Sequence, residues 1–342
     1  MKSVDSYKCR ERIQFVDLAK FVGIFLMVLC HSGMQNLLTV IIYAFHMPLF
    51  FFLSGYLFDR NKNHDGLTIR FIKKRVYAIL VPYTFFSLIL CFGKSGMIDW
   101  AYILYASRDS LAFADSFTPL WFLPCFFLSS VIFFVVSKLT MSNGFLYYML
   151  ISLITIVGFV LSSFRVYLPY GYPFHFDVAF IGVLLMALGN EVKKIPLNPY
   201  LGGAFFLAGM ILSLFNRPIS LTYDNPHVEM SISSYGNPFL FIIVSCMLCM
   251  AIVYWCRKII ECQYLPQKII NLMSFFGENT IIVLCIHGIF VNILMISFSK
   301  LGIELLGIEA IAISILCFGL LYPTIYFMNK NIPNLIGKRV CK

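Results

Sequence analysis

Apolar segments long enough to cross a lipid bilayer recur along almost the whole chain. They run from Phe15 to Met328, and each holds roughly the 17 to 25 residues that a membrane-spanning helix needs. Hydrophobic residues make up 60% of the chain and charged residues only 12%, which leaves too little polar surface for a soluble globular protein. The sequence therefore predicts an all-α, polytopic integral membrane protein with about ten transmembrane helices, in which residues 1–342 form a single transmembrane domain.

The hydropathy pattern divides the chain into its expected spans. Their approximate ranges are 15–34, 37–58, 76–92, 119–138, 145–163, 176–191, 200–215, 238–256, 277–298 and 303–328. The first resembles a signal peptide, because basic residues precede an apolar run, but it contains Asp17 and Lys20 and lacks a small-x-small cleavage site. We expect it to be retained as the first membrane helix.

The distribution of basic residues predicts the topology. If the N-terminus lies in the cytoplasm, most lysines and arginines fall in the inner loops and the two tails. Those that fall in the outer loops are Lys94, Arg108, Arg165, Arg217 and Lys300. This alternation follows the positive-inside rule, so both termini are expected in the cytoplasm. It also accounts for the net charge of +10 without a nucleic-acid partner.

Cysteine usage gives no indication of a metal or disulfide framework. The 11 cysteines are scattered, mostly within apolar runs, and they lack the spacing of metal ligands. They are expected to be small core residues, and no metal site is predicted.

Three ionisable residues lie within the first expected span: Asp17, Lys20 and His31. Charged groups inside a membrane helix are costly, so they are functional candidates by default. Lys20 and His31 are about three helical turns apart, which places both on one stripe with about 16 Å between them along the axis. Asp17 precedes Lys20 by one turn, the spacing at which a carboxylate and an ammonium group pair. The pair therefore also has a purely structural explanation.

A second histidine, His46, lies in the outer half of the second expected span. Pro48 follows it and is expected to interrupt the helix there, while Ser54 and Gly55 permit close packing with another helix. A very short turn joins the two spans, so His31 and His46 are expected to approach one another. A lone histidine in the membrane is a packing residue about as often as it is a functional one. Two histidines on adjacent spans favour a functional site.

Two long outer loops combine aromatic residues with carboxylates, a mixture that suits sugar rings. The first, 93–118, contains Trp100, Tyr102, Tyr105, Asp99, Asp109 and Asp115, and the second, 216–237, contains Tyr223, Asp224, His227, Glu229 and Tyr235. The first loop is also compatible with a short amphipathic helix along the interface. Aromatic residues are enriched at any membrane interface, so a structural role is the alternative for each of them.

Several motifs together resemble a known family. Lys20 and His31 have ten residues between them, Phe45 to Pro48 read Phe-His-Met-Pro, and Phe51 to Tyr56 read Phe-Phe-Leu-Ser-Gly-Tyr. Further matches are Arg70 to Tyr83, Leu120-Trp121-Phe122-Leu123, and Gly277-Glu278-Asn279-Thr280 leading to His287. This set resembles acyltransferase family 3, and its details look most like the fucose 4-O-acetylase-like branch.

The resemblance implies a membrane-bound O-acetyltransferase. Such an enzyme moves an acetyl group from cytoplasmic acetyl-CoA to a hydroxyl of a cell-surface glycan sugar, in O-antigen, capsule or exopolysaccharide. The implied location is the bacterial inner membrane, and the implied partners are acetyl-CoA, a glycan acceptor that is lipid-linked or polymeric, and the lipid bilayer. No permanently bound cofactor is implied.

The resemblance also implies roles for individual residues. His31 is the expected base that takes the hydroxyl proton, or a transient acyl carrier, with His46 orienting it or binding the acceptor. Lys20, beside Asp17, is expected along the channel of the thioester, and the family often has arginine at its position. The remaining candidates are Ser54, Trp121 and His287 for substrate binding, and Arg70, Lys73, Lys74 and Arg75 for the CoA phosphates. The alternative for these four basic residues is that they only set the membrane topology.

Transport is the competing class of function, because a flippase or exporter of lipid-linked sugar would also contain charged residues in its spans. The chain shows no convincing internal repeat, which is the common signature of transporters. A membrane sensor or scaffold, a third alternative, would not need two facing histidines. Transfer of radiolabelled acetyl from acetyl-CoA by the purified protein distinguishes these classes.

Overall fold

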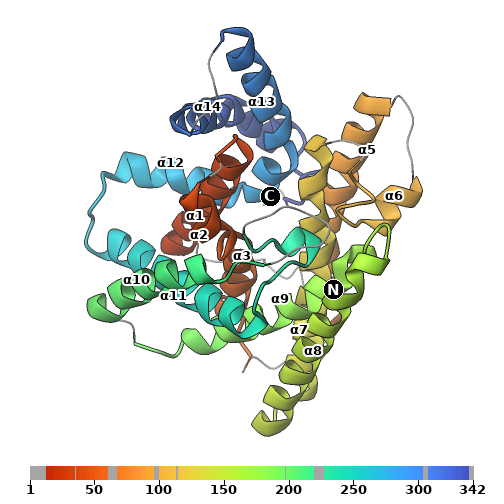
Figure 1. Ribbon diagram of the computed structural model, residues 1–342, viewed down its shortest axis with the longest axis vertical. Coiled ribbons are helices and arrows are strands. Elements are labelled where there is room, and N and C mark those ends of the chain that lie inside the picture. Colours follow the sequence, from red (N-terminus) through yellow and green to blue (C-terminus); the bar gives the residue numbers. More distant parts are fainter. Residues whose placement is uncertain are drawn as a thin grey trace, which may run out of the picture.

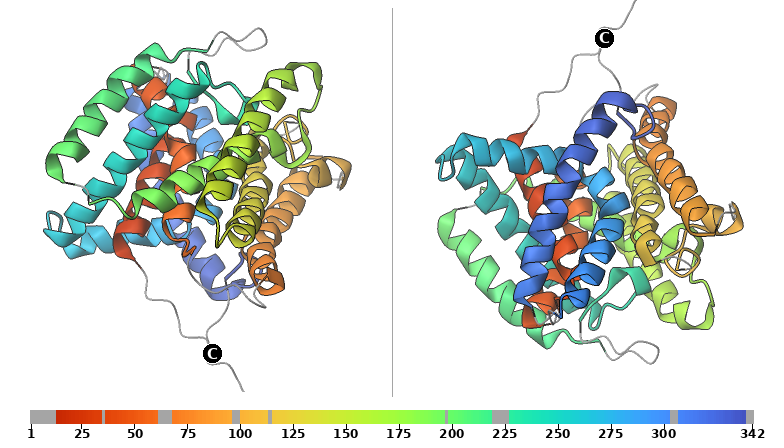
Figure 2. Two further views of the ribbon diagram at one scale, coloured as in Figure 1. Left: turned by 90° about the horizontal axis from the view of Figure 1, so that it is seen from below. Right: turned by 90° about the horizontal axis from the view of Figure 1, so that it is seen from above.

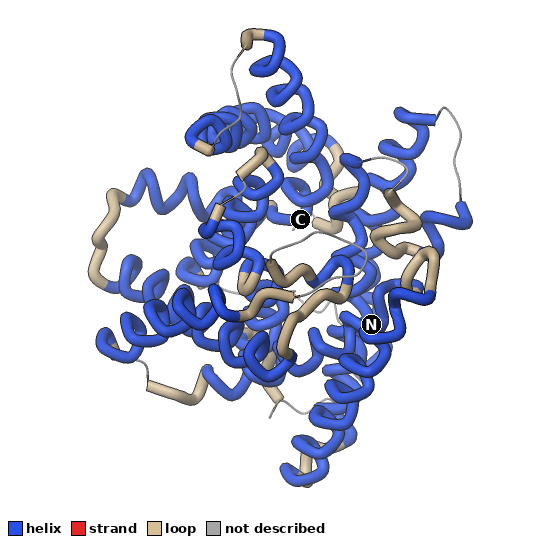
Figure 3. Tube along the Cα trace, in the orientation of Figure 1, coloured by secondary structure: helices blue, strands red, loops and turns tan. Residues whose placement is uncertain are grey.

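The computed structural model describes residues 13–34, 36–60, 68–95, 100–112, 115–196, 198–218, 227–302 and 307–338. Within these ranges the chain forms helices joined by turns and loops, with one isolated β-bridge between Glu229 and Ser234 (Figure 1 and Figure 3). The α-helices are α1 (Gln14–His31), α2 (Leu37–Tyr43), α3 (His46–Tyr56), α4 (Thr68–Arg75), α5 (Val81–Ser95), α6 (Trp100–Tyr105), α7 (Phe122–Leu139), α8 (Gly144–Phe164), α9 (Phe176–Val192), α10 (Pro199–Phe215), α11 (Pro238–Glu261), α12 (Gln267–Glu278), α13 (Thr280–Lys300) and α14 (Ile308–Asn331). The all-α prediction is confirmed.

Nine helical segments in the described part of the chain are long and apolar enough to cross a membrane. They are Gln14–His31, Leu37–Tyr56, Thr68–Phe92, Thr118–Leu139, Gly144–Tyr167, Pro173–Val192, Pro238–Glu261, Thr280–Lys300 and Ile308–Asn331. The shorter apolar helix α10 coincides with the expected span 200–215. Each expected span thus has a helical counterpart, and the prediction of a polytopic membrane protein is confirmed.

Helix α1 lies at the centre of the bundle and contacts α3, α11, α12, α13 and α14. Figure 2 shows it, in red, among the teal and blue helices in both views. Leu18, Ile24 and Val28 are fully buried, so this helix packs against protein rather than lipid. That position allows one helix to carry Lys20 and His31 without turning them toward the hydrocarbon.

Helices α3 and α9 pack with their backbones in direct contact. A Cβ atom at Gly55 would clash with the carbonyl oxygen of Met186, and one at Gly189 would clash with the carbonyl oxygen of Phe52. The side-chain amide of Asn190 donates hydrogen bonds to the carbonyl oxygens at the end of α3, 3.1 Å to that of Gly55. Small residues at a helix contact allow such close approach in a membrane, where apolar burial gives little net attraction.

The second expected span is broken, and the break lies before His46 instead of after it. Helix α2 ends at Tyr43 and α3 begins at His46, so Pro48 sits in the first turn of a helix, where proline is tolerated. Because Pro48 has no N–H group, it cannot bond the carbonyl oxygen of Ala44, and the hydroxyl of Ser245 on α11 donates to that oxygen at 2.7 Å instead. The neighbouring helix thus satisfies the freed backbone group.

The third expected span begins earlier than the hydropathy pattern predicts. Helix α4 holds the basic residues and continues through a π-helical turn, Val76–Leu80, directly into α5. The basic segment is therefore the first part of a helix rather than a loop. Single π-turns inside helices are frequent at functional sites.

An additional helix, α12, precedes the expected ninth span. It is amphipathic, with Ile270 and Phe276 buried and with Gln267, Lys268 and Asn271 exposed. It packs across α1, where a Cβ atom at Gly277 would meet the carbonyl oxygen of Asp17. The chain then turns at Asn279, and α13 begins at Thr280.

Candidate active site

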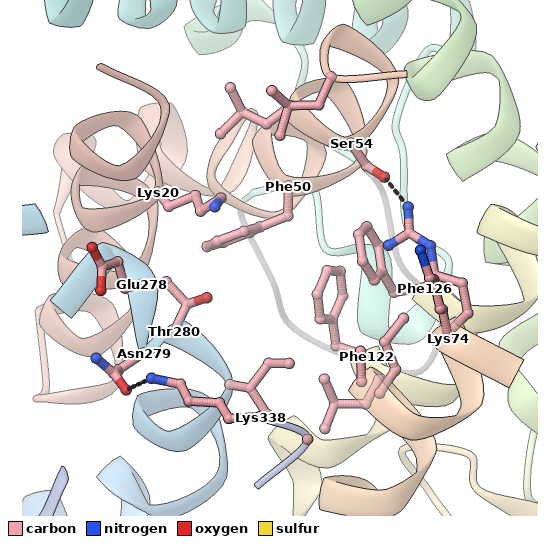
Figure 4. A pocket seen from close by; sticks show the side chains of 18 of the residues that line it. Lys20, Phe50, Ser54, Lys74, Phe122, Phe126, Glu278, Asn279, Thr280 and Lys338 are labelled. Atoms are coloured by element: carbon pink, nitrogen blue, oxygen red, sulfur yellow. Dashed lines mark hydrogen bonds between the residues drawn. The ribbon is translucent and has the colours of Figure 1, made fainter. Parts of the chain in front are cut away.

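A cavity of about 1320 Å³ lies near the beginning of α1 (Figure 4). We call it the Lys20 cavity. Its walls come from α1, α3, α4, α7, the α12–α13 junction and the segment after α14. The charged residues that line it are Lys20, Asp59, Arg70, Lys74, Arg75, Glu278 and Lys338. Phe50, Phe122 and Phe126 add an apolar surface, so the cavity offers both cationic and aromatic contacts.

The ion pair expected within α1 is present. The Lys20 ammonium lies 2.9 Å from Oδ1 of Asp17, at the spacing of one helical turn. The Lys20 side chain keeps 28% of its exposure, whereas that of Asp17 keeps 11%. Lys20 therefore faces the cavity while its partner is turned into the packing against α12.

Three of the four basic candidates on α4 line this cavity. They are Arg70, Lys74 and Arg75, whereas Lys73 is exposed and is not part of the lining. Arg75 donates to the Ser54 hydroxyl at 3.4 Å, and its guanidinium lies over the ring of Phe71. Ser54, a candidate for substrate binding, thus belongs to the Lys20 cavity (Figure 4).

A second cavity, of about 310 Å³, lies at the other end of α1. We call it the His31 cavity. It is lined mainly by polar and aromatic side chains from α1, α2, the segment before α7 and the loop before α11. These include His31, Thr39, Tyr43, Arg108, Trp121, His227, Glu229 and Ser231. His31 is exposed to this cavity, although protein surrounds it on the other sides.

His31 is hydrogen-bonded to His287, which is fully buried on α13. Nδ1 of His31 lies 2.8 Å from Nε2 of His287, and the two rings stack with centroids 5.1 Å apart. Nδ1 of His287 lies 3.0 Å from the carbonyl oxygens of Val283 and Leu284. A carbonyl oxygen only accepts, so this Nδ1 carries the proton and Nε2 of neutral His287 is an acceptor. His31 therefore donates from Nδ1, which leaves the lone pair on its Nε2.

His46 lies near His31 but bonds elsewhere. Its Nδ1 donates to the carbonyl oxygen of Ile42 at 2.9 Å, and its ring meets that of Tyr43 edge-on. His31 and His46 both line a small recess of about 50 Å³ that borders the His31 cavity. The two histidines thus approach as expected, but His287 is the one that the structure brings into hydrogen-bond contact with His31.

The loop before α11 forms part of the wall of the His31 cavity. The His227 ring lies 4.0 Å from that of Tyr43, centroid to centroid, and Glu229 accepts a hydrogen bond from Ser231. Burial lowers the pKa of His227, and the Glu229 carboxylate opposes that shift. Tyr235 is buried against core phenylalanines away from the cavity. The other two loop candidates, Tyr223 and Asp224, lie outside the described residues.

Arg108 lines the cavity from the loop between α6 and α7, and the sequence reasoning did not single it out as a site residue. Its backbone N–H donates to Nε2 of His175 at 2.7 Å, and the His175 ring meets that of Trp121 edge-on. Asp109 bridges the side chains of Arg108 and Arg165. The only pattern that pointed to Arg108 was its place among the few basic residues of the outer loops.

Two aromatic residues of the expected outer loop 93–118, Tyr102 and Tyr105, make contacts with the segment before α9. Tyr105 donates to the carbonyl oxygen of Gly171 at 2.8 Å, and Tyr102 packs against Tyr170. Trp100 begins the short helix α6 and is exposed. Asp99 and the side chain of Asp115 lie outside the described residues. Trp121, which was a candidate for substrate binding, lines the His31 cavity.

The two cavities come close together along two segments. Trp121 lines the His31 cavity, and the next residue, Phe122, lines the Lys20 cavity. On α13, Ile282 lines the Lys20 cavity, while Leu284 lines the recess beside His31. The large cationic cavity and the small polar one are therefore bordered by the same two segments.

A family model described as an acyltransferase domain matches residues 13–328. This chain belongs to acyltransferase family 3. The match covers both cavities except for the C-terminal segment, and it makes the chain a membrane acyltransferase. No curated protein and no solved structure is significantly similar to this acyltransferase. Its place in the fucose 4-O-acetylase-like branch stays a prediction.

Proposed function

We propose that this acyltransferase moves an acetyl group from acetyl-CoA to a hydroxyl of a cell-surface glycan sugar. In this proposal the donor occupies the Lys20 cavity and the sugar occupies the His31 cavity. The protein lies in a bacterial cytoplasmic membrane with both termini inside, a topology that the positive-inside distribution of lysine and arginine supports.

The chemistry of the Lys20 cavity supports a CoA thioester as the donor. Arg70, Lys74 and Arg75 carry the charges that attract phosphates, and the aromatic walls suit the less polar pantetheine arm. The first turn of α13 also faces this cavity, and the N–H groups of a helix N-terminus favour an anion. Lys20 and His31 are about 16 Å apart along α1, which is close to the length of such an arm.

The His31 cavity supports a sugar acceptor. Its volume of about 310 Å³ is in the range of small-molecule sites, and its lining mixes hydroxyl, carboxylate and guanidinium groups with aromatic rings. Glu229 and Arg108 can bond sugar hydroxyls as acceptor and donor, while the ring of Trp121 offers an apolar face.

His31 acts as the general base in this mechanism. The hydrogen-bond chain from the α13 backbone through His287 leaves the Nε2 lone pair of His31 directed away from its partner. That nitrogen takes the proton of the sugar hydroxyl as its oxygen attacks the thioester carbonyl. The carbon–sulfur bond then breaks, and the proton passes to the departing thiolate, so the products are the acetyl ester and free CoA. This pair of histidines is the observation that carries the proposal.

The hydrogen bond from Nδ1 of His31 to Nε2 of His287 also stabilises the positive charge that develops on His31. His287 cannot give up its Nδ1 proton to a carbonyl, so it holds His31 in one tautomer and one orientation. Arg108 and Tyr43 line the same cavity and carry donors for the oxyanion that forms at the thioester carbonyl oxygen.

Transport of a lipid-linked sugar is the second candidate, because two cavities at opposite ends of one helix are also compatible with a substrate path. Membership of an acyltransferase family and the fixed tautomer of His31 favour group transfer. A transporter would move the sugar without consuming acetyl-CoA.

The test uses purified protein in detergent with radiolabelled acetyl-CoA and the isolated surface glycan of the host. We expect label in the glycan together with an equal amount of free CoA thiol. His31→Ala should lower the rate about a hundredfold or more, while Arg217→Ala, at an exposed site outside both cavities, should leave it unchanged. Full activity of His31→Ala at normal expression would remove His31 from the mechanism, and absence of any thiol release by the wild type would overturn the acetyltransferase proposal.

A further inference from the structure

The segment that follows α14 folds back against the third span and ends in the wall of the Lys20 cavity. Ile336 is buried at 3% exposure, and the left-handed backbone of Gly337, with a φ of 74°, passes close to the carbonyl oxygens of Tyr77 and Ala78. The Tyr77 hydroxyl lies 3.0 Å from Oδ1 of Asn334 and 3.2 Å from the carbonyl oxygen of Lys338. These contacts fix the backbone of the tail without any contribution from the Lys338 side chain.

The Lys338 ammonium is held at the cavity wall by a neutral amide. Its Nζ lies 2.6 Å from Oδ1 of Asn279, which is buried at 2% exposure at the start of α13. The same oxygen accepts from Asn329 at 3.0 Å, and the Asn279 amide nitrogen donates to the carbonyl oxygen of Phe275 at 2.6 Å. Asn279 is therefore fixed in one orientation, and it positions the ammonium group at the cavity wall.

Lys338 places a cation opposite the basic residues of α4. In Figure 4, Lys338 and Asn279 lie on one side of the cavity, and Lys74 lies on the other. Lys20 is on the same side as Lys338, near the start of α13. Cations thus border the cavity on two walls, with Asp59 and Glu278 as the acidic residues of the lining. A polyanionic ligand between these walls would contact groups from both.

We propose that Lys338 is a binding residue for the phosphates of the acyl donor, and that the C-terminal tail is part of the donor site. This inference rests on the proposed function, because it takes the donor to be a CoA thioester. The alternative is that Lys338 only joins the tail to Asn279. The hydrophobic and backbone contacts of Ile336 and Gly337 already anchor the tail, which favours a role for the charge itself.

The test compares two donors on three variants of the full-length protein. Acetyl-CoA carries phosphates, whereas acetyl-pantetheine carries the same thioester without any phosphate. Lys338→Gln should raise the KM for acetyl-CoA about tenfold, the effect expected for loss of one charge-assisted hydrogen bond, and leave the KM for acetyl-pantetheine unchanged. Lys338→Arg should keep most of the affinity for acetyl-CoA. Lys330→Gln, at an exposed lysine of α14 outside the cavity, is the control and should change neither value.

Each outcome decides the matter. The ratio of the two KM values does not depend on the folded fraction, so it remains informative if Lys338→Gln lowers the yield. An equal change for both donors, or no change for either, would mean that Lys338 only ties down the tail. If direct titration shows that the wild type does not bind CoA, the proposed function fails and this inference fails with it, whereas CoA binding that Lys338→Gln leaves intact overturns this inference alone.

Discussion

The ring nitrogens of His31 and His287 lie 2.8 Å apart, although 256 positions of sequence separate the two residues. The bond joins the end of α1 to the middle of α13, and His287 is in turn tied to the carbonyl oxygens of its own helix. A histidine held in this way by a buried neighbour has one tautomer available for its free nitrogen. Two helices of the described chain, α1 and α13, therefore determine which nitrogen of His31 carries the free lone pair.

Replacement of His287 should reduce turnover more than binding. His287→Ala removes the acceptor for Nδ1 of His31, so the ring loses its fixed orientation. We expect kcat to fall about 10- to 100-fold, with a smaller change in the KM for the acceptor. Steady-state kinetics with the isolated glycan measures both values. His46→Ala is the matched comparison, because Nδ1 of that ring donates to the carbonyl oxygen of Ile42 on α2. A change confined to KM in His287→Ala would assign it to substrate binding instead.

The Asp17–Lys20 pair separates a structural role from a functional one. Replacing both residues, as Asp17→Leu with Lys20→Met, removes the ion pair together, a change that is often close to neutral for stability. If Lys20 lines the donor path, the double variant should fold yet lose affinity for acetyl-CoA, and Lys20→Arg should stay active. Titration of the purified variants with CoA measures this. Unchanged affinity in the double variant would leave Lys20 as a structural residue.

Arg108 should contribute to acceptor binding, and His175 should act through it. Arg108→Gln removes the guanidinium from the His31 cavity, and we expect the KM for the glycan to rise about tenfold. His175→Ala removes the acceptor of the Arg108 backbone N–H and should reproduce part of that effect, while Lys300→Ala, at the end of α13, serves as a control. The KM for acetyl-CoA should be the same in all of these variants. If the KM for the glycan rises more in His175→Ala than in Arg108→Gln, His175 does not act through Arg108 alone.

The contact between α3 and α9 should be sensitive to a single methyl group. Gly55→Ala places a Cβ atom against the Met186 carbonyl oxygen and should lower the free energy of unfolding by about 1 to 3 kcal/mol. Gly203→Ala on α10 meets open space and should change it by less than about 1 kcal/mol, in the stabilising direction. Thermal unfolding in detergent compares the two. Equal midpoints of thermal unfolding for the two variants would mean that α3 and α9 can move apart at Gly55 without a loss of stability.

Residues that act within one helix were predictable from the sequence. The spacing of Asp17 and Lys20 indicated their ion pair, and hydropathy indicated where the spans lie. The partner of His31 was not predictable, because helical periodicity says which residues share a face but not which distant helix packs against that face. The nearest histidine in sequence, His46, was the natural expectation, and the packing of α13 against α1 brought His287 closer.

Two further features depended on tertiary contacts in the same way. Arg108 owes its place to His175, which lies on a different span, and no local pattern connects them. The tail residue Lys338 looked like one of several basic residues that set topology. Its position at the cavity became visible only when the contacts of Asn279 and Gly337 were known.

The interruption between α2 and α3 has a consequence for biosynthesis. The carbonyl oxygen of Ala44 is satisfied by Ser245, yet the ribosome completes α2 and α3 long before it reaches α11. Until α11 is inserted, that oxygen faces the membrane without its native partner, which is costly in a medium that offers no hydrogen bonds. The N-terminal hairpin that carries His31 and His46 can therefore reach its final form only late in synthesis, so nascent chains that stop before α11 should be substrates for membrane quality control.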